Sequence, residues 1–126
     1  MLTTGAHGIL HTHTRTAESV RAFVQTTRYP FQTIDKDVIG EGLRGAGGQT
    51  PANEIWDLDT AEYARRADPW PMNPEGELIL GLKIEDRYCL ENVDEIVEVP
   101  GIGFAEWGPG DMGMSLGHPD AHDPPY

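Results

Sequence analysis

The chain has 126 residues, enough for one domain with one hydrophobic core and few for two. Its 21 acidic and 9 basic side chains give a formal net charge of −12, which argues against nucleic acid or an anionic membrane as the main partner. The one cysteine, Cys89, excludes an internal disulfide, and no stretch reaches the roughly 20 apolar residues that cross a bilayer, so we expect a cytoplasmic protein.

The first quarter of the chain predicts a strand and a helix. Residues 8–13 form a short run typical of a buried strand. Thr16 is a suitable N-cap for a helix over residues 17–27, which Pro30 brings to an end. The buried stripe expected for this helix repeats at helical spacing and consists of Val20, Phe23, Val24 and Thr27.

Residues 31–74 show little periodicity, and we predict that they form a long excursion from the sheet. Within it, one short helix is expected from Asp59 to about Ala67, with Glu62 completing a capping box. The prolines that follow this helix end it and argue against a barrel strand. We therefore expect the excursion to lie at a subunit interface or a pocket rim.

The second half of the chain alternates strand, helix and strand. Residues 77–84 form a near-continuous apolar run, as in a strand buried on both faces. A single amphipathic helix is predicted over residues 87–99, ended by Pro100 and Gly101. A further strand is predicted over residues 102–107.

This order of elements predicts an α/β fold with a parallel sheet and right-handed crossovers. About three βα units do not close a barrel, and they leave two open parallel edges with apolar faces. Such a sheet is rarely stable alone in water, so we expect the chain to be part of something larger.

Two acids, Glu85 and Asp111, each come just past a predicted strand. The carboxyl ends of neighbouring parallel strands meet at one edge of the sheet, where α/β proteins place their chemistry. Carboxylate oxygens are the ligands that Mg²⁺ and Mn²⁺ prefer. The sequence therefore predicts a divalent-metal site at this edge.

Several short motifs surround these acids and lie upstream of them. The segments in the second half are Lys83-Ile84-Glu85, Val99-Pro100-Gly101-Ile102, Gly108-Pro109-Gly110-Asp111-Met112 and Ser115-Leu116-Gly117. The upstream segments are Gly5-Ala6, Thr16-Ala17-Glu18, Arg28-Tyr29-Pro30 and Arg44-Gly45. Together they resemble the HpcH/HpaI aldolase/citrate lyase family of class II pyruvate aldolases, which are (β/α)₈ TIM barrels, over nearly the whole chain.

The resemblance implies that Glu85 and Asp111 hold the divalent metal, Mg²⁺ or Mn²⁺ with Co²⁺ as an alternative. It implies that Gly108, Pro109, Gly110 and Asp111 bind the substrate, with two amide groups facing the carboxylate of a 2-oxo acid. The metal would act as a Lewis acid and promote enolate formation. The implied reaction is aldol cleavage or addition with pyruvate or hydroxypyruvate and an aldehyde, carried out by a homo-oligomer.

A complete barrel of this class needs roughly 250 residues, and the chain resembles only the fourth to sixth βα units. No segment matches the family's general-base histidine, its partner aspartate or its pyruvate-binding arginine, so the catalytic residues are unknown. We expect residues 1–126 to form a single partial barrel domain without aldolase activity on its own. The alternative is a non-catalytic barrel fragment that acts only by assembling with a complementary segment.

Other roles stay open for some of these residues. Glu85 and Asp111 could each cap the helix that follows its strand. His11 and His13 could bind a transition metal from one face of a strand, although satisfied histidines near the barrel mouth are the favoured interpretation. Lys83 stands where the family often has glutamine, and it could form a Schiff base or, as we favour, an ion pair.

Two more polar features need an explanation. Glu106 interrupts an otherwise apolar strand, and we expect it either to face the barrel interior beside a base such as Lys83 or to mark a polar interior. A loose group of acids and histidines close to the C-terminus resembles a metal-binding tract but is better interpreted as a polar loop. Its members are His118, Asp120, His122 and Asp123.

Overall fold

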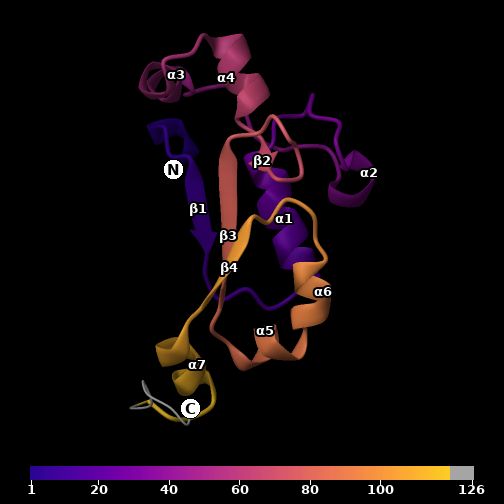
Figure 1. Ribbon diagram of the computed structural model, residues 1–126, viewed down its shortest axis with the longest axis vertical. Coiled ribbons are helices and arrows are strands. Elements are labelled where there is room, and N and C mark those ends of the chain that lie inside the picture. The colour runs from indigo at the N-terminus through magenta and orange to yellow at the C-terminus, as the bar shows by residue number, and fades with distance from the viewer. Residues whose placement is uncertain (120–126) are drawn as a thin grey trace.

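The computed structural model describes residues 1–119, which form one parallel sheet with helices packed against it (Figure 1). The strands are β1 (Gly8–His11), β2 (Pro69–Trp70), β3 (Leu78–Ile84) and β4 (Phe104–Trp107). Each strand pairing is parallel, which confirms the predicted α/β fold with an open parallel sheet.

Strand β3 lies at the centre of this sheet. β1 occupies one edge of it, from Gly8 opposite Ile79 to His11 opposite Leu82. The other edge is shared, because β2 pairs with the start of β3 and β4 pairs with its last four residues, 81–84. Within residues 1–119, the outer edges of β1 and β4 have no further strand beside them.

The helices follow local capping signals. They are α1 (Ala17–Thr27), α2 (Lys36–Ile39), α3 (Thr50–Trp56), α4 (Thr60–Arg66), α5 (Arg87–Glu91), α6 (Val93–Val97) and α7 (Pro109–Ser115), with a 3-10 turn at Leu2–Thr4. Thr16 caps α1 by accepting a hydrogen bond from the Ser19 amide, and Asp59 caps α4 by accepting one from the Glu62 amide. None of the helices in residues 1–119 is long and apolar enough to cross a membrane.

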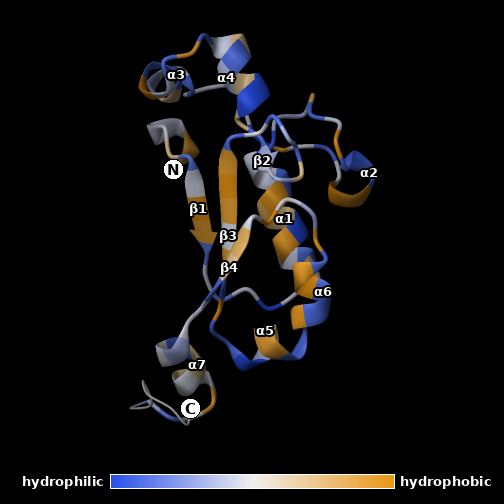
Figure 2. Cartoon of the chain, in the orientation of Figure 1, coloured by the Kyte–Doolittle hydropathy of each residue, from blue (hydrophilic) through white to orange (hydrophobic). Residues whose placement is uncertain are grey.

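The main core lies between β3 and the helices α1, α5 and α6. Alternate residues of β3 point toward these helices, and β3 is hydrophobic along most of its length in Figure 2. Cys89 packs inside this core, as expected for a small apolar side chain. The buried residues of the core are Val20, Val24, Ile39, Leu80, Leu82, Ile84, Cys89, Ile96 and Val99.

A second core cluster lies around the start of β3. It includes Tyr29, Ala52, Tyr63, Ala67 and Leu78. Beside it, the buried Arg28 side chain forms a two-fold contact with the buried Asp68, at 2.7 Å from Nε to Oδ1 and 2.8 Å from Nη2 to Oδ2. This pair joins the end of α1 to the residue before β2.

The region predicted as one helix over residues 87–99 contains two helices. Asn92 separates α5 from α6 with φ −110° and ψ 14°, and its side-chain amide donates to the carbonyl oxygens of Arg15 and Tyr88. An asparagine side chain competes with helical hydrogen bonds for backbone groups. Apolar residues continue at helical spacing on both sides of Asn92, so the sequence pattern did not predict the break between α5 and α6.

Residues 31–74 are more regular than predicted. They contain α2 and α3 in addition to the expected α4, and the latter has its predicted start. Pro69 and Trp70 also add the two-residue strand β2, opposite Leu78 and Ile79. Proline is compatible with β2 because it is the first residue of this strand and the strand lies at an edge of the sheet.

Candidate metal-binding site

The carboxyl ends of β1, β3 and β4 meet at one edge of the sheet, and both predicted metal ligands lie there. Glu85 directly follows β3, and 1% of its side chain is exposed. Asp111 lies in the first turn of α7, which begins just after β4, and it is exposed. This is the edge at which parallel α/β proteins bind their ligands.

Both carboxylate oxygens of Glu85 have a defined neighbour. Oε1 accepts a hydrogen bond of 3.0 Å from the backbone amide of His13, whose Nδ1 lies 3.9 Å from the same oxygen. Lys83 Nζ lies 2.9 Å from Oε2. The ion pair that we favoured for Lys83 is therefore present, and its partner is Glu85.

The Oε2 atom of Glu85 is closed to solvent and receives no hydrogen bond, because its contact with Lys83 has the distance but not the geometry of one. Gly108 packs directly against this side chain. A Cβ at Gly108 would lie 2.5 Å from the Glu85 Cβ and 2.8 Å from Oε2. Glycine is therefore the residue that lets the turn after β4 approach the carboxylate.

The charges at this edge are coupled. Burial acts to raise the pKa of Glu85, but Lys83 and the His13 amide outweigh it and hold that pKa below its ordinary value. Contact with Glu85 raises the pKa of Lys83, and the charges of Glu106 and Asp111 act in the same direction. Glu85 is thus an anion at neutral pH, and Lys83 is one cation near three carboxylates.

Neither predicted ligand caps a helix. The N-cap of α5 is Asp86, which accepts a hydrogen bond of 2.8 Å from the Tyr88 amide. The N-cap of α7 is Gly108, and no side chain caps that helix. The capping alternative for Glu85 and Asp111 is therefore not realised.

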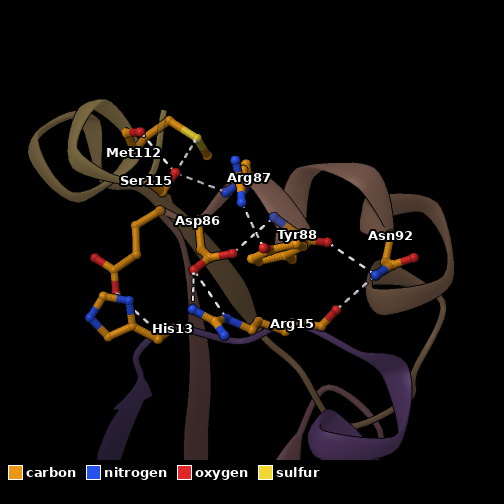
Figure 3. A network of polar contacts seen from close by, with 9 residues as sticks. His13, Arg15, Asp86, Arg87, Tyr88, Asn92, Met112 and Ser115 are labelled. Carbon is orange, nitrogen blue, oxygen red and sulfur yellow. Dashed lines mark hydrogen bonds and ion pairs between the residues drawn. The ribbon is translucent and has the colours of Figure 1, made fainter. Parts of the chain in front are cut away.

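A polar network braces the loops around the site (Figure 3). Asp86 accepts hydrogen bonds of 3.0 and 2.7 Å from Nε and Nη2 of Arg15, and the Arg15 guanidinium lies 5.0 Å from the centre of the Tyr88 ring. The hydroxyl of Ser115 in α7 accepts a hydrogen bond from the Arg87 amide. These contacts join the loop after β1, the loop after β3 and helix α7 into one unit.

The bracing roles of Asp86, Arg15 and the His13 amide were not predicted from the sequence. Asp86 carries a usable signal, because an aspartate directly before a helix is a common N-cap. Arg15 and the amide of His13 carry none, since their roles depend on contacts with residues more than 70 positions away. Only the packing of β1 beside β3 brings them to Glu85.

The structure does not form the alternative histidine pair. Strand β1 ends at His11, whose ring stacks on Phe23 at 4.8 Å and whose Nδ1 lies 2.6 Å from Thr14 Oγ1. Burial lowers the pKa of His11. His13 has a left-handed φ of 49° and leaves the strand alternation.

No group of three His, Cys, Asp or Glu side chains within residues 1–119 is arranged to hold a metal ion. The loose tract near the C-terminus falls mostly beyond this part of the chain. Its residues outside the described structure are Asp120, His122 and Asp123.

Comparison with known sequences identifies close counterparts of this chain. The sequence model of the HpcH/HpaI aldolase/citrate lyase family matches residues 1–125. The chain is 34% identical over 120 residues to a 2-keto-3-deoxy-L-rhamnonate aldolase from Klebsiella pneumoniae subsp. pneumoniae, and 36% identical over 103 residues to a hydroxypyruvate/pyruvate aldolase from Deinococcus radiodurans. The alignments cover 95% and 82% of this chain but 39% and 31% of those relatives.

Solved structures show the same relation. A HpcH/HpaI aldolase/citrate lyase family protein from Burkholderia cenocepacia J2315 matches with a TM-score of 0.77 and 23% identity, covering 98% of this chain and 43% of that one. A HpcH/HpaI aldolase from Desulfitobacterium hafniense DCB-2 matches with a TM-score of 0.67 and 26% identity, covering 92% and 39%. The open sheet therefore corresponds to part of a barrel of this family.

Proposed function

This chain belongs to the HpcH/HpaI aldolase/citrate lyase family, and from that premise we propose that it carries the metal-binding part of an aldolase active site. The proposed reaction is aldol cleavage or addition through the enolate of a 2-oxo acid, such as pyruvate or hydroxypyruvate, with an aldehyde as the second substrate. The observation that carries the proposal is the buried, ionised Glu85 at the carboxyl edge of the sheet.

The residues at this edge fit a divalent cation such as Mg²⁺ or Mn²⁺. Glu85 and Asp111 would hold it, because both offer hard carboxylate oxygens. The Oε2 atom of Glu85 is buried and accepts no hydrogen bond, and the Lys83 ammonium group lies 2.9 Å from it, so this position accommodates a cation beside the carboxylate. When bound, the metal would polarise the carbonyl group of the 2-oxo acid.

The turn at residues 108–111 is the proposed substrate-binding segment. Gly108 keeps the turn against Glu85, and Pro109 takes the first helical position of α7, where a missing N–H costs nothing. Gly110 and Asp111 follow in the first turn, so their amide groups have no acceptor within the helix. These amides are suited to the substrate carboxylate, and this assignment rests on the family motif.

The test of the proposed metal site is calorimetric titration of the chain with Mn²⁺. We expect specific binding by the wild type and its loss in Glu85→Ala and in Asp111→Ala, since each removes a charged ligand. Asp94→Ala, which alters an exposed acid in α6, is the matched control and should bind as the wild type does. Far-UV circular dichroism verifies folding, and undiminished affinity in Asp111→Ala would contradict the assignment.

A further inference from the structure

Lys83 is placed where it must affect any cation that approaches Glu85. Lys83 and Glu85 are two positions apart at the end of β3, so their side chains lie on the same face. Lys83 Nζ is 2.9 Å from Glu85 Oε2. That oxygen is closed to solvent, whereas 23% of the Lys83 side chain is exposed. Gly108 lies against the same oxygen and also faces the Lys83 side chain. A metal ion that binds Oε2 would therefore compete with the ammonium group for the same oxygen.

Three carboxylates act electrostatically on the Lys83 ammonium group. Glu106 lies directly opposite Lys83 in the register of β3 and β4. Asp111, from the first turn of α7, is close enough for its charge to act on Lys83 together with those of Glu85 and Glu106. Three carboxylates without a cation would repel one another, so the ammonium group balances them in the metal-free protein.

We propose that Lys83 is an internal cation that occupies the Glu85 carboxylate in the metal-free protein and gives way to the divalent ion on binding. The inference rests on the metal site proposed above and adds a residue that sets its affinity. Glu106 is the acceptor for the displaced ammonium group, because it is the cross-strand neighbour of Lys83. Cross-strand pairs of opposite charge are mutually stabilising.

Variants at Lys83 and at Glu106 are expected to change the Mn²⁺ affinity in opposite directions. Lys83→Gln removes the competing cation, so we expect Mn²⁺ to bind roughly tenfold more tightly than to the wild type. Glu106→Gln removes the acceptor for the displaced ammonium, so Mn²⁺ should bind more weakly. Lys36→Gln, which breaks the exposed ion pair with Glu41, is the matched control and should leave the affinity unchanged.

A double-mutant cycle separates displacement from simple charge effects. If Glu106 acts by receiving Lys83, then Glu106→Gln weakens Mn²⁺ binding in the wild type and has no effect in the Lys83→Gln background. If Glu106 acts only through its negative charge, it weakens binding equally in both backgrounds, and the displacement mechanism is wrong.

A measurement on the unmodified chain covers the case in which a variant fails to fold. The chain contains two lysines, Lys36 and Lys83. Acetylation by a water-soluble ester, followed by mass spectrometry, should modify Lys83 several-fold faster with saturating Mg²⁺ than without it, while the rate at Lys36 stays the same. An unchanged rate at Lys83 overturns the inference.

The outcomes also distinguish this inference from the function on which it rests. If Mn²⁺ binding depends on Glu85 but Lys83→Gln does not tighten it, the proposed metal site stands and the role of Lys83 is wrong. Absence of Mn²⁺ binding in both the wild type and Lys83→Gln overturns both.

Discussion

Arg28 and Arg44 are both buried, yet their surroundings differ. Arg28 donates hydrogen bonds from Nε and Nη2 to the Asp68 carboxylate. Its third nitrogen, Nη1, donates to the Ile34 carbonyl oxygen. Breaking a buried ion pair leaves an uncompensated charge, which costs far more than breaking an exposed one.

The first residue-scale prediction concerns this pair. Asp68→Ala should lower the free energy of unfolding by about 3–5 kcal/mol, because it leaves the Arg28 guanidinium buried and unpaired. Glu41→Ala breaks the exposed pair with Lys36 and should cost less than about 1 kcal/mol. Urea unfolding followed by circular dichroism measures both variants, and equal losses would contradict the difference in burial.

For Arg44 we expect that removing the charge does not lower the free energy of unfolding. Its Nη2 donates to Tyr63 Oη, and its guanidinium lies 4.5 Å from the Tyr29 ring centre, but Nη1 is buried without an acceptor. No carboxylate of residues 1–119 forms an ion pair with it. An apolar side chain of similar length removes the desolvation cost of a buried charge that has no anionic partner, and this gain offsets the lost contacts with Tyr63 and Tyr29.

We therefore predict that Arg44→Met leaves the free energy of unfolding unchanged or raises it. The same urea titration decides this, with Asp68→Ala as the destabilised reference. A loss comparable to that of Asp68→Ala would show that Arg44 has a partner that stabilises its charge.

At the scale of elements, the site depends on how closely the turn after β4 approaches the end of β3. Gly108 makes this approach possible, since any larger residue would overlap the Glu85 side chain. The neighbouring Asp86 and Ser115 then tie α5 and α7 to the same region. The position of the metal ligands is therefore set by contacts between elements and not by one element alone.

Gly108→Ala should displace the Glu85 carboxylate and weaken Mn²⁺ binding at least roughly tenfold, because its Cβ would lie 2.5 Å from the Glu85 Cβ. Gly47→Ala is the matched control, since an added Cβ meets nothing within 4 Å there. Calorimetry compares the two variants. Equal Mn²⁺ affinities would show that Glu85 tolerates the shift and that the close approach is unimportant for binding.

At the scale of the whole molecule, three strands of the sheet, β1, β2 and β4, have an unpaired side within residues 1–119. The outer edges of β1 and β4 carry backbone groups without strand partners in residues 1–119, and the strand β4 is exposed along its length. Large apolar side chains are exposed at the same places, including Leu10, Phe104 and Trp107. Unpaired edges of this kind promote association between chains.

We predict that the 126-residue chain alone self-associates and does not catalyse aldol chemistry. Enolate formation needs a base within about 3 Å of the reacting carbon or of a bound water, and no residue here matches the base of the family. Sedimentation velocity measures the association, and deuterium exchange of pyruvate with Mg²⁺ or Mn²⁺, followed by NMR, measures the chemistry. One of the aldolases named above serves as positive control.

A monomeric chain would contradict the first part of this prediction. Metal-dependent exchange at a rate comparable to the positive control would contradict the second, and would identify His11, His13 or Lys83 as the base.

The sequence by itself determined the parallel α/β fold, the bounds of α1, the start of α4 and the family, because these depend on local caps, apolar periodicity and short motifs. It also placed Glu85 and Asp111 at one edge, since parallel strands share their carboxyl ends. Only the tertiary structure decided the break at Asn92, the strand β2 and the partners of Glu85. Each of these depends on contacts between segments distant in sequence, such as His13 with Glu85, and periodicity does not encode such contacts.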